Sequence, residues 1–130
     1  VCLFQILVHI CFHFGKPMFH VQSVQLKFAY MLVNVASSRL LIHRSVFNAA
    51  KGLPDILEPS SAKCFSKESA REVTTTAMQL MGGYGFNKEY GMERKVRDSF
   101  GWGIAGGTID VQKVNIASAM IGRRFNQRAK

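Results

Sequence analysis

Acidic side chains are scarce in this sequence of 130 residues, and cysteine and proline are scarcer still. Only 8 Asp and Glu stand against 17 Lys and Arg, and there are three cysteines and three prolines. Cys2, Cys11 and Cys64 are too few and too scattered for a disulfide framework or a zinc site, so a reduced intracellular compartment is the default. We assign the four histidines packing or surface roles and predict no metal site.

The sequence also lacks an apolar run long enough to cross a membrane. Residues 1–14 are nearly all apolar, but a helical span needs about 20 such residues. The stretch has neither the basic start nor the cleavage site of a signal peptide. We expect the end of a buried helix here and, because the first residue is Val, a fragment or a processed product. We therefore separate an apolar leader of uncertain origin, residues 1–13, from a helical domain over residues 14–130.

The excess of basic residues gives a formal charge of +9, which favours an anionic partner. A nucleic acid, an anionic membrane surface or a phosphorylated cofactor would each suit it. No zinc-finger spacing and no aromatic motif for binding single strands is present, so we predict no nucleic-acid partner. The densest basic stretch, residues 123–130, is interpreted as a solvated helix end, where cations interact favourably with the helix dipole, in preference to a binding patch.

Hydrophobic periodicity predicts an antiparallel helix bundle. With 48% hydrophobic and 19% charged residues, the chain has the composition of one globular domain. Three- and four-residue spacing of apolar and small side chains predicts long helices over 20–50 and 59–81 and shorter ones over 92–99 and 108–124. The residues predicted to face inward are Val21, Val24, Phe28, Met31 and Val35, then Ala62, Phe65, Ser69, Val73, Ala77 and Leu80, then Val111, Val114 and Ala117 or Ser118. The predicted class is all-α.

Two glycine-bearing junctions are the candidates for chemistry. The break over 101–107 ends in Gly106-Gly107-Thr108, with Thr108 suited to cap the last helix and Asp110 in its first turn. Backbone N–H groups at such a helix start bind anionic or carbonyl oxygens. At the other junction Gln79, ahead of Gly82-Gly83, has an amide that donates and accepts. A plain glycine C-cap is the competing interpretation of both.

Two further groups are given structural roles. Glu93, Arg94, Arg97 and Asp98 lie within one and a half helical turns, which predicts a local ion-pair set that fixes the loop between the glycine breaks. Cys64 lies beside the stripe of small residues and is predicted to be buried rather than reactive.

An ordered set of short motifs resembles the C-terminal domain of the acyl-CoA dehydrogenase family. The motifs are Phe14-Gly15-Lys16-Pro17 with Gln22, Ala62-Lys63, the run from Gln79 to Phe86, Glu89-Tyr90, Glu93-Arg94, Arg97-Asp98 and Gly106-Gly107-Thr108. Each is unspecific alone, but their order is maintained from residue 14 to about 124. The resemblance implies a four-helix bundle that completes a flavin site, often across a subunit interface.

The same resemblance implies roles for individual residues. The implied FAD contacts are Phe14, Gln22, Gln79, Gly82, Gly83, Thr108 and Asp110, with Gln79, Gly82 and Gly83 reaching the FAD of a neighbouring subunit. Gly106 and Gly107 would border the substrate. The implied partners are an acyl-CoA substrate, like subunits in a dimer or tetramer, and an electron-transfer flavoprotein.

Two departures from the family pattern bear on catalysis. Many members have Glu-Gly-Thr in the last motif, with that Glu as the base, whereas this chain has Gly106. Since glycine cannot accept a proton, no catalytic residue is assigned, and the base is expected on a segment before residue 1. The family's usual Arg, three residues before Phe-Gly, is replaced by Cys11.

These departures leave alternatives open. The first interpretation is the FAD-binding and oligomerisation domain of an acyl-CoA dehydrogenase-like oxidoreductase, incomplete and inactive alone. A non-catalytic assembly module or partner subunit is the second, and a relative that performs another flavin reaction, such as oxygen-dependent oxidation, is the third. The implied location is the mitochondrial matrix in a eukaryote or the cytoplasm in a bacterium.

Overall fold

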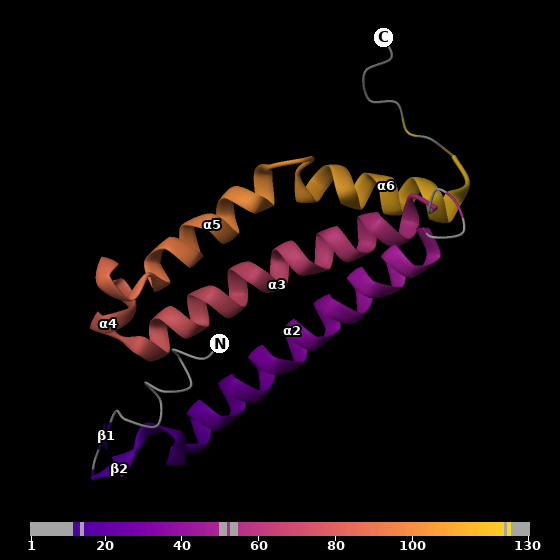
Figure 1. Cartoon of the computed structure of the whole chain (residues 1–130). Coiled ribbons are helices and arrows are strands. Elements are labelled where there is room, and N and C mark those ends of the chain that lie inside the picture. Colours follow the sequence, from indigo (N-terminus) through magenta and orange to yellow (C-terminus); the bar gives the residue numbers. More distant parts are fainter. Residues whose placement is uncertain (1–11, 14, 50–51, 53–54, 124, 126–130) are drawn as a thin grey trace.

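The computed structural model of the chain describes residues 12–13, 15–49, 52, 55–123 and 125, and this part is almost entirely helical (Figure 1). In chain order the elements are β1 (Phe12–His13), β2 (Lys16–Pro17), the 3-10 turn η1 (Met18–His20), α2 (Gln22–Ala49), α3 (Leu57–Met81), α4 (Gly83–Phe86), the 3-10 turn η2 (Lys88–Tyr90), α5 (Met92–Ile104) and α6 (Ile109–Ile121). β1 and β2 form a two-residue antiparallel pair. The predicted all-α class is confirmed.

Helix α3 lies in the middle of the molecule. α2 runs antiparallel along one side of it, and α5 and α6 follow one another back along the other side (Figure 1). The four long helices thus form the predicted antiparallel arrangement, with α5 and α6 sharing one side of α3. Among the described helices, none combines the length and the apolar character that a membrane span requires.

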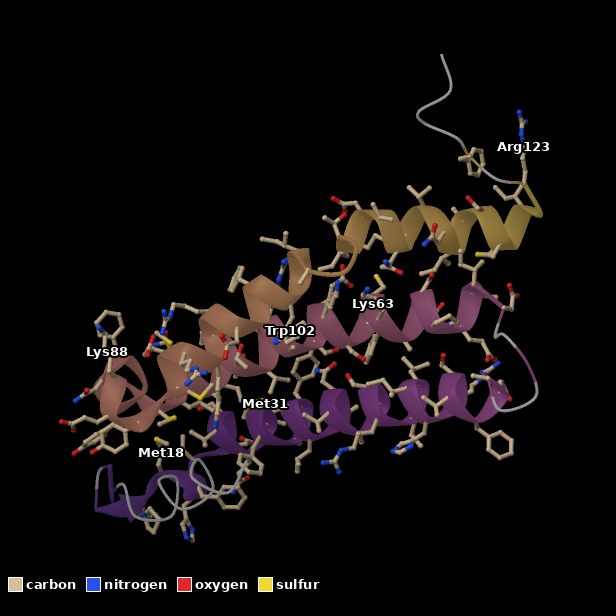
Figure 2. All side chains as sticks on the ribbon, turned by 45° about the horizontal axis from the view of Figure 1, so that its top comes forward. Met18, Met31, Lys63, Lys88, Trp102 and Arg123 are labelled. Carbon is tan, nitrogen blue, oxygen red and sulfur yellow. The ribbon has the colours of Figure 1, made fainter. Side chains whose placement is uncertain are left out.

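The main apolar core lies where α2 begins and α3 ends. Its buried members are Met18, Val24, Met31, Ala77, Met81 and Met92, and Met18 and Met31 are labelled in Figure 2. Phe19 and Phe28 meet edge to face beside it, with ring centroids 5.8 Å apart. The spacing that predicted the inner face of α2 is therefore confirmed from Val24 onward, whereas Val21 is exposed.

Small and hydroxyl-bearing residues allow α3 to pack on both sides. Its predicted stripe is confirmed, with Ala62, Ser69 and Ala77 buried. The Ser69 hydroxyl donates to Asn34 Oδ1 of α2 at 3.3 Å. On the other side the Thr74 hydroxyl is hydrogen-bonded to the buried hydroxyl of Ser99 in α5 at 3.1 Å. These polar links help to fix the register of α3 against its neighbours.

Helix α5 is longer than predicted. It continues beyond Ser99 to Ile104, so Gly101 and Gly103 lie within the helix and not in a break. The guanidinium of Arg71 packs against Gly103, where a Cβ atom would overlap it. The glycine therefore permits a close approach of α5 to α3 and does not end the helix.

The inward face of α6 was predicted only in part, since Val114 and Ser118 are half-buried. Ile109 and Gln112 are the buried residues, while Val111 and Ala117 are exposed. Apolar residues lie on every face of 109–121, so periodicity alone does not define the packed side. The helix also ends earlier than predicted, at Ile121, where Gly122 adopts a left-handed conformation.

The predicted helix end over residues 1–14 lies mostly outside the described residues. Of that segment, Phe12 and His13 are described, and they form strand β1 rather than a helix. The division at residues 13 and 14 remains a prediction.

Gly85 in α4 offers a test of how closely the chain packs after α3. A Cβ atom on Gly85 would lie 2.6 Å from the carbonyl oxygen of Met78, whereas a Cβ atom on Gly83 would meet nothing within 4 Å. We expect Gly85→Ala to lower the free energy of unfolding by about 1–3 kcal/mol through overpacking. Gly83→Ala, the matched control, should change it by about 0.5 kcal/mol or less. Urea denaturation measures both, and equal effects would contradict the described packing.

Candidate functional site

The α5–α6 junction is a tight loop formed by Ala105, Gly106 and Gly107. Gly106 and Gly107 have φ values of 63° and 91°, which favour glycine because other residues are strained there. Thr108 caps α6 as predicted, since its Oγ1 accepts a hydrogen bond from the Val111 amide at 3.3 Å. The loop therefore delivers the chain directly into a capped helix start.

Two lysines of α3 donate hydrogen bonds to the carbonyl groups of this loop. Lys63 Nζ donates to the carbonyl oxygen of Gly106. Lys67 Nζ donates to the carbonyl oxygens of Ala105 at 2.9 Å and Gly107 at 2.7 Å. Three consecutive carbonyl groups thus point toward α3, and Lys63 lies between that helix and the junction (Figure 2).

Lys67 is an unusual residue to find buried. It is 8% exposed, and no ion pair in the described part of the chain includes it. Burial lowers the pKa of Lys67, and the positive charges of Lys63 and Arg71 lower it further. Arg71 lies one turn beyond, 5.0 Å from the ring centroid of Phe100. α3 thus presents a row of three cations at four-residue spacing to α5 and α6.

The groups around Gly106 are poor candidates for a base or a nucleophile. A Cβ atom on Gly106 would lie 3.1 Å from Lys63 Nζ. Asp110 is exposed in the first turn of α6. Cys64 is buried, as predicted, and burial, followed by the charge of Glu68, raises the pKa of its thiol. Glu68 is bound to Lys113 of α6 at 2.7 Å.

The second junction lies at the far end of α3. Gly82 ends that helix with a positive φ of 57° and donates its N–H to the carbonyl of Gln79 at 3.2 Å. Gln79, Gly82 and Gly83 are all exposed. Gln22 is exposed at the start of α2, at the same end of the molecule (Figure 1). Phe14 lies outside the described residues.

The structure therefore does not bring all the predicted site residues together within one chain. Lys63, below the α5–α6 loop, and Gln79 are sixteen residues apart on α3, which corresponds to about 24 Å along the helix axis. Thr108, Asp110, Gly106 and Gly107 form one group, and Gln22, Gln79, Gly82 and Gly83 lie in another region.

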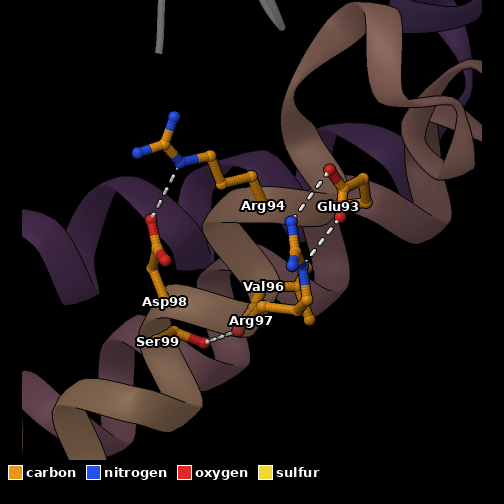
Figure 3. A network of polar contacts seen from close by, with 6 residues as sticks. All are labelled: Glu93, Arg94, Val96, Arg97, Asp98 and Ser99. Carbon is orange, nitrogen blue, oxygen red and sulfur yellow. Dashed lines mark hydrogen bonds and ion pairs between the residues drawn. The ribbon is translucent and has the colours of Figure 1, made fainter.

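The predicted ion-pair set is confirmed on α5 (Figure 3). Arg97 Nε lies 2.9 Å from Glu93 Oε2, and Arg94 Nε lies 3.7 Å from Asp98 Oδ2. The arginines are largely exposed, so these pairs contribute little to stability. They lie within helix α5 and not beside a loop, so the predicted role of fixing a loop was wrong.

Sequence reasoning missed the role of the two lysines. Lys63 was named only as part of the Ala62-Lys63 motif, and Lys67 was not named. The signal that identifies them is their four-residue spacing, because it places both side chains on one side of α3.

Comparison with known proteins now identifies the family. The family model described as acyl-CoA dehydrogenase, C-terminal domain, matches residues 12–121. The chain belongs to the acyl-CoA dehydrogenase family. The resemblance to the C-terminal domain of this family is therefore confirmed, and the antiparallel helices described above form that domain.

Individual relatives differ in the reactions their names describe. The chain is 35% identical over 114 residues to a 3-sulfinopropanoyl-CoA desulfinase of Advenella mimigardefordensis, covering 88% of this chain and 28% of that protein. It is 36% identical over 116 residues to an acryloyl-CoA reductase (NADH) of Anaerotignum propionicum, covering 89% and 29%. Its structure matches butyryl-CoA dehydrogenase from Megasphaera elsdenii with a TM-score of 0.87 and 30% identity, covering 91% and 31%. The chain thus spans about three tenths of the length of the relatives it matches.

Proposed function

We propose that this chain is the FAD-binding and oligomerisation domain of an acyl-CoA dehydrogenase-like flavoenzyme that acts on acyl-CoA thioesters. The observation that carries the proposal is the capped start of α6, preceded by two glycines and lined from below by lysines. A helix start of this kind attracts anionic oxygens. We assign Thr108 and Asp110 to the diphosphate and ribityl region of FAD, and Gly106 and Gly107 to the edge of the substrate.

The separation of the two predicted groups supports a shared site between subunits. One extended cofactor would have to cover about 24 Å along α3 to reach both Lys63 and Gln79. We therefore assign Gln79, Gly82 and Gly83 to contacts with the FAD of a neighbouring subunit. Phe14, in the Phe-Gly-Lys-Pro turn, and Gln22, in the helix that follows it, are also assigned to FAD contacts. The exposure of Gln79, Gly82 and Gly83 agrees with this assignment.

The base for α-proton removal is proposed to come from outside residues 1–130. Such a base needs an oxygen within hydrogen-bond reach of the substrate carbon, and Gly106 offers none. When bound, FAD supplies the acceptor for the β-hydrogen. Within the loop, this chain's contribution is to orient the thioester and cofactor. A Glu side chain at position 106 would require Lys63 to move, since the Cβ atom alone would lie 3.1 Å from its Nζ.

A different flavin reaction is the second candidate. Gly106 leaves the usual base position without a carboxylate, and one relative is named a desulfinase rather than a dehydrogenase. Cleavage of a bond other than C–H would not need a carboxylate at that position. The electron-transfer flavoprotein partner and the matrix or cytoplasmic location belong to the dehydrogenase proposal alone.

An exposed stripe on α2 is the proposed contact with a like subunit. Leu26, Val33 and Leu40 are 66%, 62% and 70% exposed and recur every seven residues. The intervening Ala29 and Ala36 are exposed as well. A seven-residue apolar repeat is typical of a helix that packs against another helix. We assign the α2 of a second copy as that partner, in keeping with the oligomer that the family resemblance implies.

Flavin binding and chemistry can be separated in the 130-residue chain. We expect the fluorescence of added FAD to be quenched when it binds to the chain. Thr108→Ala should weaken binding because the start of α6 loses its cap and a hydroxyl, and such a cap contributes about 1 kcal/mol. Thr75→Ala, at an exposed position of α3, is the matched control and should bind as the unaltered chain does.

The same samples test the absence of a base. Mixed anaerobically with butyryl-CoA, the chain and FAD should show no bleaching of flavin absorbance. Bleaching at an enzymatic rate would mean that a base lies within residues 1–130, and absence of FAD binding would overturn the proposed cofactor role.

The α2 stripe is tested by sedimentation equilibrium. We expect the unaltered chain to self-associate, and Val33→Glu combined with Leu40→Glu to yield a monomer, because buried carboxylates without partners disfavour the interface. Thr75→Glu serves as the control at an exposed polar position. A monomeric unaltered chain at high concentration, or an oligomer that survives the double substitution, would refute the assignment.

A further inference from the structure

The three carbonyl groups held by Lys63 and Lys67 determine where the amides of the loop point. In a trans peptide the C=O of one residue and the N–H of the next lie in the peptide plane and point in opposite directions, and the described chain has no cis bonds. Because the carbonyls of residues 105–107 point toward α3, the N–H groups of residues 106–108 point away from it. Within the described residues, these three amides donate no hydrogen bond of good geometry.

We propose that Lys63 and Lys67 are positioning residues of the flavin-binding loop, which they hold with its carbonyls inward and its amides outward toward the cofactor. This inference rests on the proposed function, since it assigns the outward amides to an anionic group of FAD. It adds two residues of α3, which lie behind the loop.

The chemistry of Lys67 supports a positioning role over a merely structural one. Burying a cation without a carboxylate is costly, and a neutral side chain of similar length would fill the same space between α3 and the loop. What a cation adds is a donor to two carbonyls at once, at 2.9 and 2.7 Å, and a positive charge directly behind the outward amides. Both effects favour an anionic oxygen at the start of α6.

The two lysines share the task in a defined way. Lys67 bridges the outer two carbonyls of the loop, those of Ala105 and Gly107, and Lys63 takes the carbonyl of Gly106 between them. Gly106 and Gly107 adopt the left-handed conformations that this arrangement requires. We therefore expect loss of Lys67 to release more of the loop than loss of Lys63.

The test compares Lys67→Met, Lys67→Arg and Lys63→Met in the full 130-residue chain, with exposed Lys95→Met on α5 as the control. ¹⁵N relaxation reports the loop without any ligand. We expect order parameters of Gly106 and Gly107 near 0.85 in the unaltered chain and below about 0.6 in Lys67→Met, with Lys63→Met between them. Lys67→Arg should restore order, because a guanidinium can also donate to two carbonyls.

FAD titration of the same proteins tests the link to the cofactor. Lys67→Met should weaken FAD binding about tenfold, the loss of one charge-assisted interaction, and Lys67→Arg should recover most of it. Equal FAD affinity in Lys67→Met and the unaltered chain, or a loop that stays ordered without Lys67, would overturn the inference. A third outcome separates the two proposals: the unaltered chain binds no FAD, but its loop loses order in Lys67→Met. That outcome would overturn the proposed function and support the role of the lysines in ordering the loop.

Discussion

Close packing of α3 on both of its sides is the constraint on which this structure depends. α2 lies along one side and α5 with α6 along the other, so α3 is packed on two sides. The buried alanines and serines of its stripe follow from this position. Each neighbour is also linked to it by a polar contact, such as Ser69 with Asn34 and Glu68 with Lys113. The central helix therefore sets the register of all the others.

The candidate site follows from that register. Since α5 approaches closely at Gly103, the chain must turn immediately afterwards to continue as α6 along the same side of α3. The turn falls over Lys63 and Lys67, which bind its carbonyls. A loop formed in this way combines a helix start, two glycines and positive charge, the features that suit an anionic cofactor. The packing of α5 and α6 along one side of α3 therefore accounts for both the fold and the position of the candidate site.

Much of the fold could be predicted from the sequence, because long periodic helices leave a strong signal. The predicted limits 20–50 and 59–81 differ from the observed 22–49 and 57–81 by at most two residues. The Thr108 cap and the Glu93–Arg97 pair are local interactions, and local spacing was sufficient to predict them. The true end of α5 was missed because Gly103 does not mark the end of a helix. It makes room for the guanidinium of Arg71, which lies 32 positions earlier in the chain. The packed face of α6 was predicted only in part because its apolar residues surround the helix.

Hydrogen exchange of the backbone amides, followed by mass spectrometry, tests the central role of α3 most directly. Amides that open only on global unfolding are the most protected. If α3 carries the fold, peptides from residues 60–80 should exchange more slowly than those from α5 or α6, which pack against one side of α3. Peptides from α5 or α6 that exchange as slowly as those from α3, or more slowly, would contradict this account.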